Sequence, residues 1–176
     1  MTLQPELCGE TIHLRPLREA DRLALKKAGS DPEIWAQHPD SERHKPENFT
    51  RFFNEALASG GALIVEEKNT KRVIGTSRYH NLDLTGGHVE IGWTFLVKDH
   101  WGGTTNRELK ALMLEHAFGM VPCVRFKIGA SNYRSRRAVE KIGARLLDLD
   151  GKSKDDSVFY EIDRQSFTRS QTTGES

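Results

Sequence analysis

The stretch that most constrains the fold runs from His88 to Phe118. Its first ten residues, HVEIGWTFLV, are largely apolar and alternate as a β-strand does, and its last twelve, RELKALMLEHAF, are strong helix formers. Gly102 and Gly103 lie in the short connection between them. Such a turn can point backbone N–H groups at a bound anion, and a plain tight connection has a similar sequence. A strand, a short turn and a helix in this order are typical of a layered α/β domain.

The remaining segments predict further strands and helices around this unit. Strands are expected at residues 11–17, 61–67, 72–80, 123–130, 145–150 and 157–162, and helices at 18–28, 45–59 and 131–144, with a helix start or turn at 30–35. This order predicts one α/β (α+β) domain over residues 1–165, with a mixed, largely antiparallel central sheet flanked by helices. Residues 166–176 are polar and are expected to form a disordered tail.

Composition excludes several classes of function. The 176 residues include 26 Lys and Arg against 25 Asp and Glu, a formal net charge of +1, which gives no case for nucleic acid or an anionic membrane as the main partner. No apolar run reaches the ~18 residues of a membrane span, and the N-terminal residues lack the pattern of a signal peptide. Cys8 and Cys123 are too few and too isolated for a disulfide framework or a zinc site. We therefore expect a cytoplasmic protein without a metal.

The strand at residues 88–97 is expected to have two unlike faces. Alternation places Val89, Ile91, Trp93, Phe95 and Val97 together on a core face. The opposite face carries Glu90 beside Gly92, a glycine that leaves room for another molecule. The Glu90 carboxylate then lies beside a binding space, or it simply lies on a solvated face.

The two later helices carry polar groups whose roles the pattern leaves open. In the first, an apolar stripe includes Leu109, Leu112, Met113 and Ala117, and His116 is expected to pack with it in the core. The second begins at Asn132, a good N-cap. Its outer side carries Arg134, Arg136, Arg137 and Lys141, a basic set that is usually solvated. The glycine turn lacks the lysine of a phosphate loop and the spacing of a dinucleotide fingerprint, which excludes those two nucleotide classes.

Taken together, the order of these features resembles the GNAT superfamily of acetyl-CoA-dependent N-acetyltransferases. The features are a strand with a carboxylate, a glycine turn, a helix, a strand, and N-x-x-S opening a helix that ends K-x-G. The segments HWGGTTNRELKALMLEHAF and VRFKIGASNYRSRRAVEKIGARL look like the branch containing the RimJ/RimL ribosomal-protein N-terminal acetyltransferases, and GETIHLRPLREAD resembles its opening strand and first helix. The resemblance spans Gly9 to Glu161. It implies the GNAT fold and acetyl-CoA as co-substrate, and a homodimer is ordinary for this branch.

The resemblance also implies a set of cofactor contacts. The pantetheine arm would add like a strand beside residues 95–97, where backbone groups lack a partner, and the pyrophosphate would lie on N–H groups at the helix start. Asn132 would bond the arm near the thioester, and Arg137 or Arg134 would meet the nucleotide phosphate. The strand and turn residues in this set are Phe95, Leu96, Val97, Trp101, Gly102, Gly103, Thr104, Thr105, Asn106 and Arg107.

Two positions depart from the family pattern. The family loop follows Q/R-x-x-G-x-G/A, and the aligned positions here hold Trp101, Thr104 and Asn106. Losing the central glycine at Thr104 is expected to narrow the backbone geometry of the turn. Many members also have a tyrosine, seven residues after the asparagine, that protonates the leaving thiolate. That position here is Val139, and Ser135 is the nearest substitute.

The implied chemistry is direct attack of a neutral amine on the thioester carbonyl in a ternary complex. It needs no covalent enzyme intermediate. A backbone N–H of the strand at residues 90–97 would meet the oxyanion. Glu90, directly or through water, is the candidate for removing the amine proton, and Ser135 is the candidate for protonating the thiolate.

The acceptor class follows from the acidity of amines. At an α-amino pKa of ~7.7 roughly one group in six is neutral at pH 7, whereas at a lysine pKa of ~10.4 it is roughly one in 2,500. A site with one carboxylate and no tyrosine acid favours a protein or peptide N-terminus, or a small-molecule amine that is weakly basic. Residues 32–61 and 79–88 are expected to recognise the acceptor. Trp35, Phe49, Phe52 and Phe53 either line that cleft or pack their helix onto the sheet.

Two other classes of function remain open from the sequence. Thr104 and Val139 are compatible with a non-catalytic acyl-CoA-binding or sensing module on the same fold, which would bind the cofactor without turnover. The basic residues 134–141 suit a nucleic-acid or ribosome-binding protein. The net charge and the lack of interleaved exposed aromatic residues argue against that class.

Overall fold

The computed structural model describes residues 2–147 and 155–173, and its strands form one eight-stranded sheet in the order β1-β2-β3-β4-β5-β6-β8-β7. The strands are β1 Leu7–Cys8, β2 Ile12–Pro16, β3 Ala62–Glu67, β4 Val73–Asp83, β5 His88–Leu96, β6 Cys123–Gly129, β7 Arg145–Leu147 and β8 Ser157–Asp163. Neighbouring strands are antiparallel except β5 and β6, which are parallel. The predicted α/β domain with a mixed, largely antiparallel sheet is confirmed.

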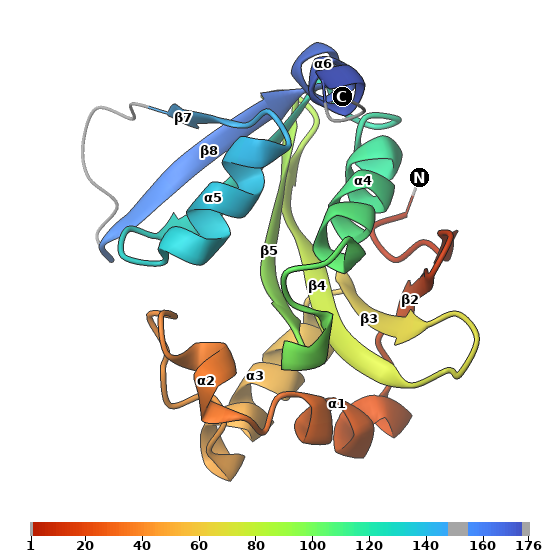
Figure 1. Cartoon of the computed structure of the whole chain (residues 1–176), viewed down its shortest axis with the longest axis vertical. Coiled ribbons are helices and arrows are strands. Elements are labelled where there is room, and N and C mark those ends of the chain that lie inside the picture. Colours follow the sequence, from red (N-terminus) through yellow and green to blue (C-terminus); the bar gives the residue numbers. More distant parts are fainter. Residues whose placement is uncertain (1, 148–154, 174–176) are drawn as a thin grey trace.

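Helices cover both faces of the sheet (Figure 1). They are α1 Arg22–Ala28, α2 Pro32–Trp35, α3 Pro46–Ala58, α4 Thr105–Ala117, α5 Tyr133–Lys141 and α6 Arg164–Thr173, with short 3-10 helices at Glu19–Asp21 and Lys98–His100. Leu63 and Val65 of β3 belong to the core that includes α4, whereas Ile64 between them belongs to the core formed with α1, α2 and α3. Because side chains alternate along a strand, the two cores lie on opposite faces of the sheet. No helix in the described ranges is long and apolar enough to cross a membrane.

Local sequence signals account for several helix starts. Asp31 caps α2 by accepting the Glu33 N–H at 2.9 Å, and Pro46 occupies the first turn of α3. Asn132 caps α5 by accepting the Ser135 N–H at 3.3 Å, as its position predicts. These side chains satisfy N–H groups that the first helical turn leaves without an internal partner.

Strand β5 contains a bulge at Trp93. Thr76 of β4 pairs with Phe95, and Arg78 pairs with Gly92, so one residue of β4 lies opposite two residues of β5. Trp93 has a backbone φ of 51°, an uncommon value for a bulky residue. The extra residue reverses the side-chain alternation beyond this point.

This reversal corrects the predicted core face of residues 89–97. Val89 and Ile91 pack in the core on the α4 face, as expected. Phe95 instead packs in the core on the α1–α3 face, and half-buried Trp93 packs against that core. The prediction that these side chains share one face is therefore wrong for the residues after the bulge.

The C-terminal segment differs from the expected disordered tail. Residues 164–173 form α6, with the side chain of Phe167 only 6% exposed and its ring 6.2 Å from that of Phe118. Ser170 Oγ donates to the Ile142 carbonyl at 2.8 Å, which joins α6 to the end of α5. The turn expected at residues 151–156 lies largely outside the described residues, as do residues 148–150 of the expected strand and residues 174–176 of the tail.

Candidate functional site

The candidate site opens where β5 and β6 separate. Within the described residues the two strands pair only from His88 to Glu90 with Cys123 to Arg125. Beyond this, β5 continues beside β4 and β6 continues beside β8, so the sheet divides into a fork. Figure 1 shows β8 and α5 leaning away from β5. A cleft of about 1260 Å³ follows the fork, and residues of α4, α5 and the segment after α2 also line it.

The β5 wall offers fewer free backbone groups than the sequence predicts. The Val97 N–H donates to the Ile74 carbonyl at 2.8 Å, so it faces β4, and Val97 does not line the cleft. Successive residues direct their backbone groups to opposite strand edges, so those of Leu96 face the fork. The Leu96 carbonyl already accepts Trp101 Nε1 at 2.9 Å, which leaves its N–H for a ligand. Phe95 and Leu96 do line the cleft.

The glycine turn brings the start of α4 to the cleft. Gly102 has a φ of 71°, a region that favours glycine, whereas Thr104 has a φ of −91°, which suits any residue. The turn as observed therefore needs no glycine at Thr104, and the narrowing expected from the loss of that glycine stays a prediction. Within residues 2–147 and 155–173, the Thr104 side chain makes no cap bond, so the first N–H groups of α4 have neither an internal nor a cap partner there. The turn and helix residues that line the cleft are Trp101, Gly102, Gly103, Asn106 and Arg107.

Other predicted turn contacts are already used within the protein. The Trp101 N–H donates to the Lys98 carbonyl at 3.0 Å. Thr105 Oγ1 lies 2.8 Å from His100 Nδ1, and His100 Nε2 lies 2.9 Å from Glu67 Oε1 of β3. Thr105 therefore holds the turn against the sheet and does not line the cleft.

Helix α5 forms the opposite wall. Asn132, Ser135 and Arg137 line the cleft as predicted. Asn132 is only 6% exposed, and its side-chain oxygen is the helix cap. Val139, at the position where many family members have a tyrosine, is buried and also lines the cleft. This wall therefore presents an amide, a hydroxyl and a cation, and Val139 contributes no proton donor.

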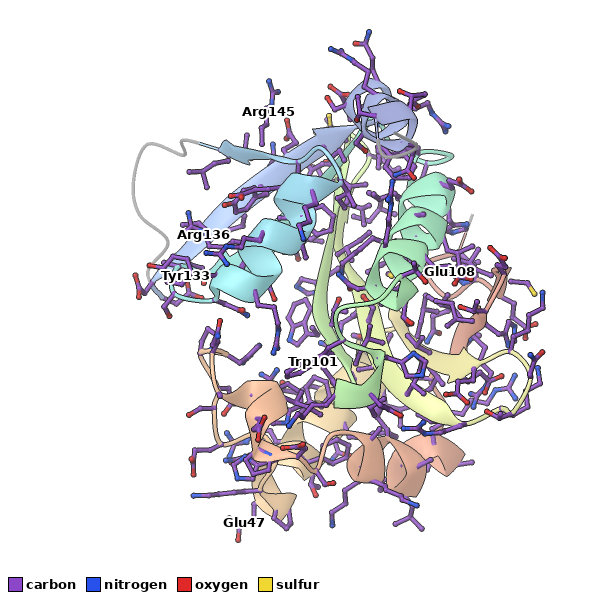
Figure 2. All side chains as sticks on the ribbon, viewed as in Figure 1. Glu47, Trp101, Glu108, Tyr133, Arg136 and Arg145 are labelled. Carbon is purple, nitrogen blue, oxygen red and sulfur yellow. The ribbon has the colours of Figure 1, made fainter. Side chains whose placement is uncertain are left out.

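The basic side of α5 is not simply solvated. The guanidinium carbon of Arg134 lies 3.9 Å from the ring centroid of Trp101, and Arg134 donates to the Ile34 carbonyl at 3.2 Å. Arg136 donates to the Tyr160 hydroxyl at 3.1 Å. Figure 2 shows Arg136 on the outer side of α5, away from Trp101. Arg137 and Lys141 also line the cleft, and among the described residues neither side chain has a hydrogen-bond or ion-pair partner.

Glu90 lies at the base of the fork. Its Oε1 accepts a hydrogen bond from Asn81 Nδ2 at 3.1 Å, and both Glu90 and Gly92 line the cleft. A side chain added at Gly92 would meet open space, which agrees with the predicted room beside this residue. Glu108 of α4 is directed elsewhere, since it accepts the Thr11 N–H at 2.8 Å and braces the start of β2 (Figure 2).

The segment after α2 forms the remaining wall. Gln37, His38, Pro39 and Arg43 line the cleft. The four aromatic residues Trp35, Phe49, Phe52 and Phe53 do not line it, because they are buried between α1, α3 and the sheet. The packing alternative is therefore correct for them. Burial is the main cause that lowers the pKa of His38, to about 4, so the imidazole is neutral near pH 7.

Lys110 of α4 is a cleft residue that the sequence analysis missed. Its Nζ donates to Thr94 Oγ1 of β5 at 2.9 Å and lies 5.5 Å from the ring centroid of Phe126 of β6. Thr94 Oγ1 in turn lies 2.8 Å from Ser77 Oγ. Lys110 is 6% exposed, and burial lowers its pKa to about 8.

The helix pattern held a signal for this residue. Lys110 shares the three- and four-residue spacing of Met113, Leu114 and Ala117, so it belongs to the buried stripe. His116, expected in the core, is half-buried, and its Nε2 donates to the Thr2 carbonyl at 2.8 Å. The buried side of α4 therefore includes Lys110 in place of the expected His116, so it faces the fork more directly than predicted.

Comparisons with known proteins agree with this architecture. A family model described as "Acetyltransferase (GNAT) domain" matches residues 11–145. A GCN5-related N-acetyltransferase from Brucella melitensis is similar in structure, with a TM-score of 0.81, 17% identity and coverage of 99% of this chain and 88% of that one. An acetyltransferase from Agrobacterium tumefaciens str. C58 has a TM-score of 0.73, 23% identity and coverage of 91% and 95%.

A third similar structure is that of Mycobacterium smegmatis RimJ in complex with CoA-disulfide. Its TM-score is 0.70, with 18% identity and coverage of 97% of this chain and 94% of that one. At these identities the likenesses show the fold. A search of curated proteins found no match.

Proposed function

The chain belongs to the GNAT family of acetyltransferases, which take the acetyl group from acetyl-CoA, and we propose that it transfers this group to a primary amine. The acceptor is the N-terminal α-amino group of a protein or peptide, or a small-molecule amine. The match of the segments at residues 100–118 and 124–146 to the RimJ/RimL-like pattern supports this branch, and RimJ is among the similar structures.

The observation that carries the proposal is the convergence of three features on one cleft. The separation of β5 and β6 leaves strand edges that an extended arm can pair with. The start of α4 presents N–H groups without a cap at the same cleft. Arg107, Arg137 and Lys141 add positive charge to its lining. A long, extended ligand with phosphate groups fits this combination of edges, N–H groups and cations.

Part of the predicted set of contacts suits this arrangement. The N–H of Leu96 suits the arm, and Asn132 lines the opposite wall of the same cleft. The N–H groups of the turn and the first turn of α4 suit the pyrophosphate, with Gly102, Gly103 and Asn106 at the cleft surface. Arg137 suits the nucleotide phosphate better than Arg134, because Arg134 is engaged by Trp101 and the Ile34 carbonyl.

The proposed chemistry is direct attack of the amine on the thioester carbonyl. When bound, acetyl-CoA supplies an activated acyl group. Glu90 takes the amine proton, directly or through water, from its place at the base of the fork. A backbone N–H of the β5 bulge donates to the oxyanion. Ser135 is the proton donor to the thiolate that the sequence predicts, and it lies on the cleft wall.

The acceptor is proposed to enter beside residues 37–43. This segment faces the fork from the side opposite α4, and Arg43 donates to Asp40 at 3.2 Å there. A weakly basic amine suits the site, because few charged groups are available to remove its proton. This reasoning favours an α-amino group over a lysine side chain.

A thermal-shift titration followed by a thiol-release assay tests the proposal. Acetyl-CoA and CoA at about 100 times their dissociation constants stabilise a fold by about 2.7 kcal/mol, and dephospho-CoA should do less if Arg137 binds the nucleotide phosphate. Thiol release with any peptide or amine in a mixed panel supports the acetyltransferase. A shift without release on any amine supports the sensing module instead, and no shift with either ligand refutes both.

A further inference from the structure

We propose that Lys110 protonates the sulfur that leaves acetyl-CoA, in the role that the tyrosine has in many family members. The inference rests on the proposed function, because it assigns one step of that reaction. Its basis is the position of the Lys110 ammonium group at the fork, between Thr94 of β5 and Phe126 of β6.

The position of Lys110 connects it to both strands of the fork. Lys110 and Asn106 lie one helical turn apart on the side of α4 that lines the cleft, so the ammonium lies deeper than the anion site at the start of the helix. Its contacts lie beyond the last paired residues, because Thr94 is four residues after Glu90 and Phe126 follows Arg125 directly. An arm that enters the fork from the start of α4 therefore brings its acyl end towards Lys110.

The Lys110 ammonium group has hydrogen-bond donors that the protein does not use. It carries three N–H donors, and within the described residues one of them is engaged, by Thr94 Oγ1. No described carboxylate lies within ion-pair distance of Lys110 Nζ, although the side chain is 6% exposed. A buried cation without a counter-ion is unfavourable, and a nearby developing anion relieves this. The sulfur that departs as a thiolate is such an anion.

The acidity of Lys110 also suits proton donation to a thiolate. Burial lowers its pKa to about 8, close to the ~8.5 of an alkyl thiol such as cysteine. At pH 7 about nine in ten Lys110 side chains carry the proton. A hydroxyl such as that of Ser135 is a much weaker acid than a thiol, so it holds its proton when a thiolate forms.

The step balances without another reactant. The amine nitrogen forms the bond to the carbonyl carbon, and the carbon–sulfur bond breaks with its electron pair on sulfur. Lys110 gives its proton to that sulfur and produces the free thiol. The proton lost by the amine leaves through Glu90 to water, and Lys110 regains a proton from water.

The first test compares Lys110→Met, Lys110→Arg and Ser135→Ala with the wild type from about pH 6 to about pH 10. We expect Lys110→Met to lower kcat about 100-fold, with the KM for acetyl-CoA within a few-fold. The wild-type rate should fall above about pH 8, and both Lys110 variants should lack that limb. Ser135→Ala tests the other candidate donor, and a larger loss of kcat in Ser135→Ala than in Lys110→Met overturns the proposal. Lys26→Met, at an exposed position on α1, is the control for the same substitution.

The second test needs no acceptor amine. The ultraviolet absorbance of the thiolate reports the thiol pKa of CoA bound to each protein. We expect that pKa to be at least about one unit lower in the wild type than in Lys110→Met, because an adjacent cation favours the thiolate. Equal thiol pKa values, or an unchanged kcat with the same alkaline limb, overturn the proposal for Lys110. Failure of the wild type to bind CoA refutes the proposed function, and this inference with it.

Discussion

Arg134 on one wall of the cleft stacks over Trp101 on the other, with its guanidinium carbon 3.9 Å from the ring centroid. The Trp101 indole N–H donates to the Leu96 carbonyl, so the contact extends from α5 to the edge of β5. Arg134 also reaches the Ile34 carbonyl of α2. One side chain therefore links three segments around the cleft.

Arg134→Ala should weaken both the fold and cofactor binding. We expect a loss of about 1 to 2 kcal/mol in the free energy of unfolding, from the cation–π contact and the hydrogen bond to Ile34. Urea unfolding measures this, and a thermal-shift titration with CoA measures the binding. Arg134→Lys should recover little of the lost stability or CoA affinity, because an ammonium cannot reproduce the planar stack. Full rescue by lysine would contradict the role of the stack.

The glycine turn makes a prediction that separates two adjacent glycines. Gly102→Ala should lower the free energy of unfolding by about 1 kcal/mol, because its φ of 71° disfavours a residue with a Cβ. Gly103→Ala should cost much less, since Gly103 is not in that region and its Cβ would meet open space. Thr104→Gly should not improve CoA affinity, because Thr104 already has an ordinary φ. Improved affinity in Thr104→Gly would show that the threonine does restrict the turn.

The C-terminal helix makes a prediction that a disordered tail would not. Phe167→Ala should lower the free energy of unfolding by about 2 to 4 kcal/mol, because it empties a buried site beside Phe118. Arg169→Ala, on the exposed side of the same helix, is the control and should change stability little. Chemical unfolding of both variants measures the difference. Equal stabilities would mean that α6 does not contribute to the core.

The features that the sequence predicts are those that depend on neighbouring residues in the chain. Asn132 caps α5 and Pro46 starts α3 because both act within one turn of their own position. The cleft residues of the glycine turn follow from a resemblance that spans strand, turn and helix. Most strands also follow from alternation, which is a local pattern.

The features that the sequence misses depend on partners distant in the chain. The bulge at Trp93 arises from a shift in the pairing register between β4 and β5. No residue pattern in β5 alone requires that shift. Lys110 is buried because the fork lies beside α4, and a lysine within an apolar stripe is normally assigned to the solvated side. Phe167 forms a helix contact because Phe118 is available to it. Tertiary packing decides all three.

His38 predicts a loss of stability in acid. Its pKa of about 4 in the folded protein is below its usual 6.5, because burial and then the charges of Arg43 and Arg134 lower it, while Asp40 raises it and offsets part of this effect. The unfolded chain therefore binds a proton that the folded chain does not, between these two values. The contribution is complete above about pH 6.5 and falls by up to about 3 kcal/mol as the pH decreases to about 4.

His38→Gln should remove this part of the pH dependence. The free energy of unfolding, measured at several pH values, should therefore fall more steeply in acid for the wild type than for His38→Gln. His44→Gln is the control, because half-buried His44 belongs to the same segment and its one hydrogen bond among the described residues is to the Ser41 carbonyl. If the free energy of unfolding depends on pH in the same way in the wild type and His38→Gln, protonation of His38 does not destabilise the folded protein.

Lys110 predicts a gain of stability in alkali. Its pKa is about 8 in the folded protein and 10.5 in its usual range, so the folded chain releases the proton first as the pH rises. Between these values the unfolded chain holds more protons, and the free energy of unfolding should rise with pH by up to about 3 kcal/mol. Lys110→Met should lack this rise. Near pH 7 it should melt at the same or a higher temperature than the wild type, because an apolar side chain replaces an unpaired buried cation. A lower melting temperature in Lys110→Met would show instead that the ammonium stabilises the fork through Thr94 and Phe126. The burial of this cation would then not lower the stability of the folded protein.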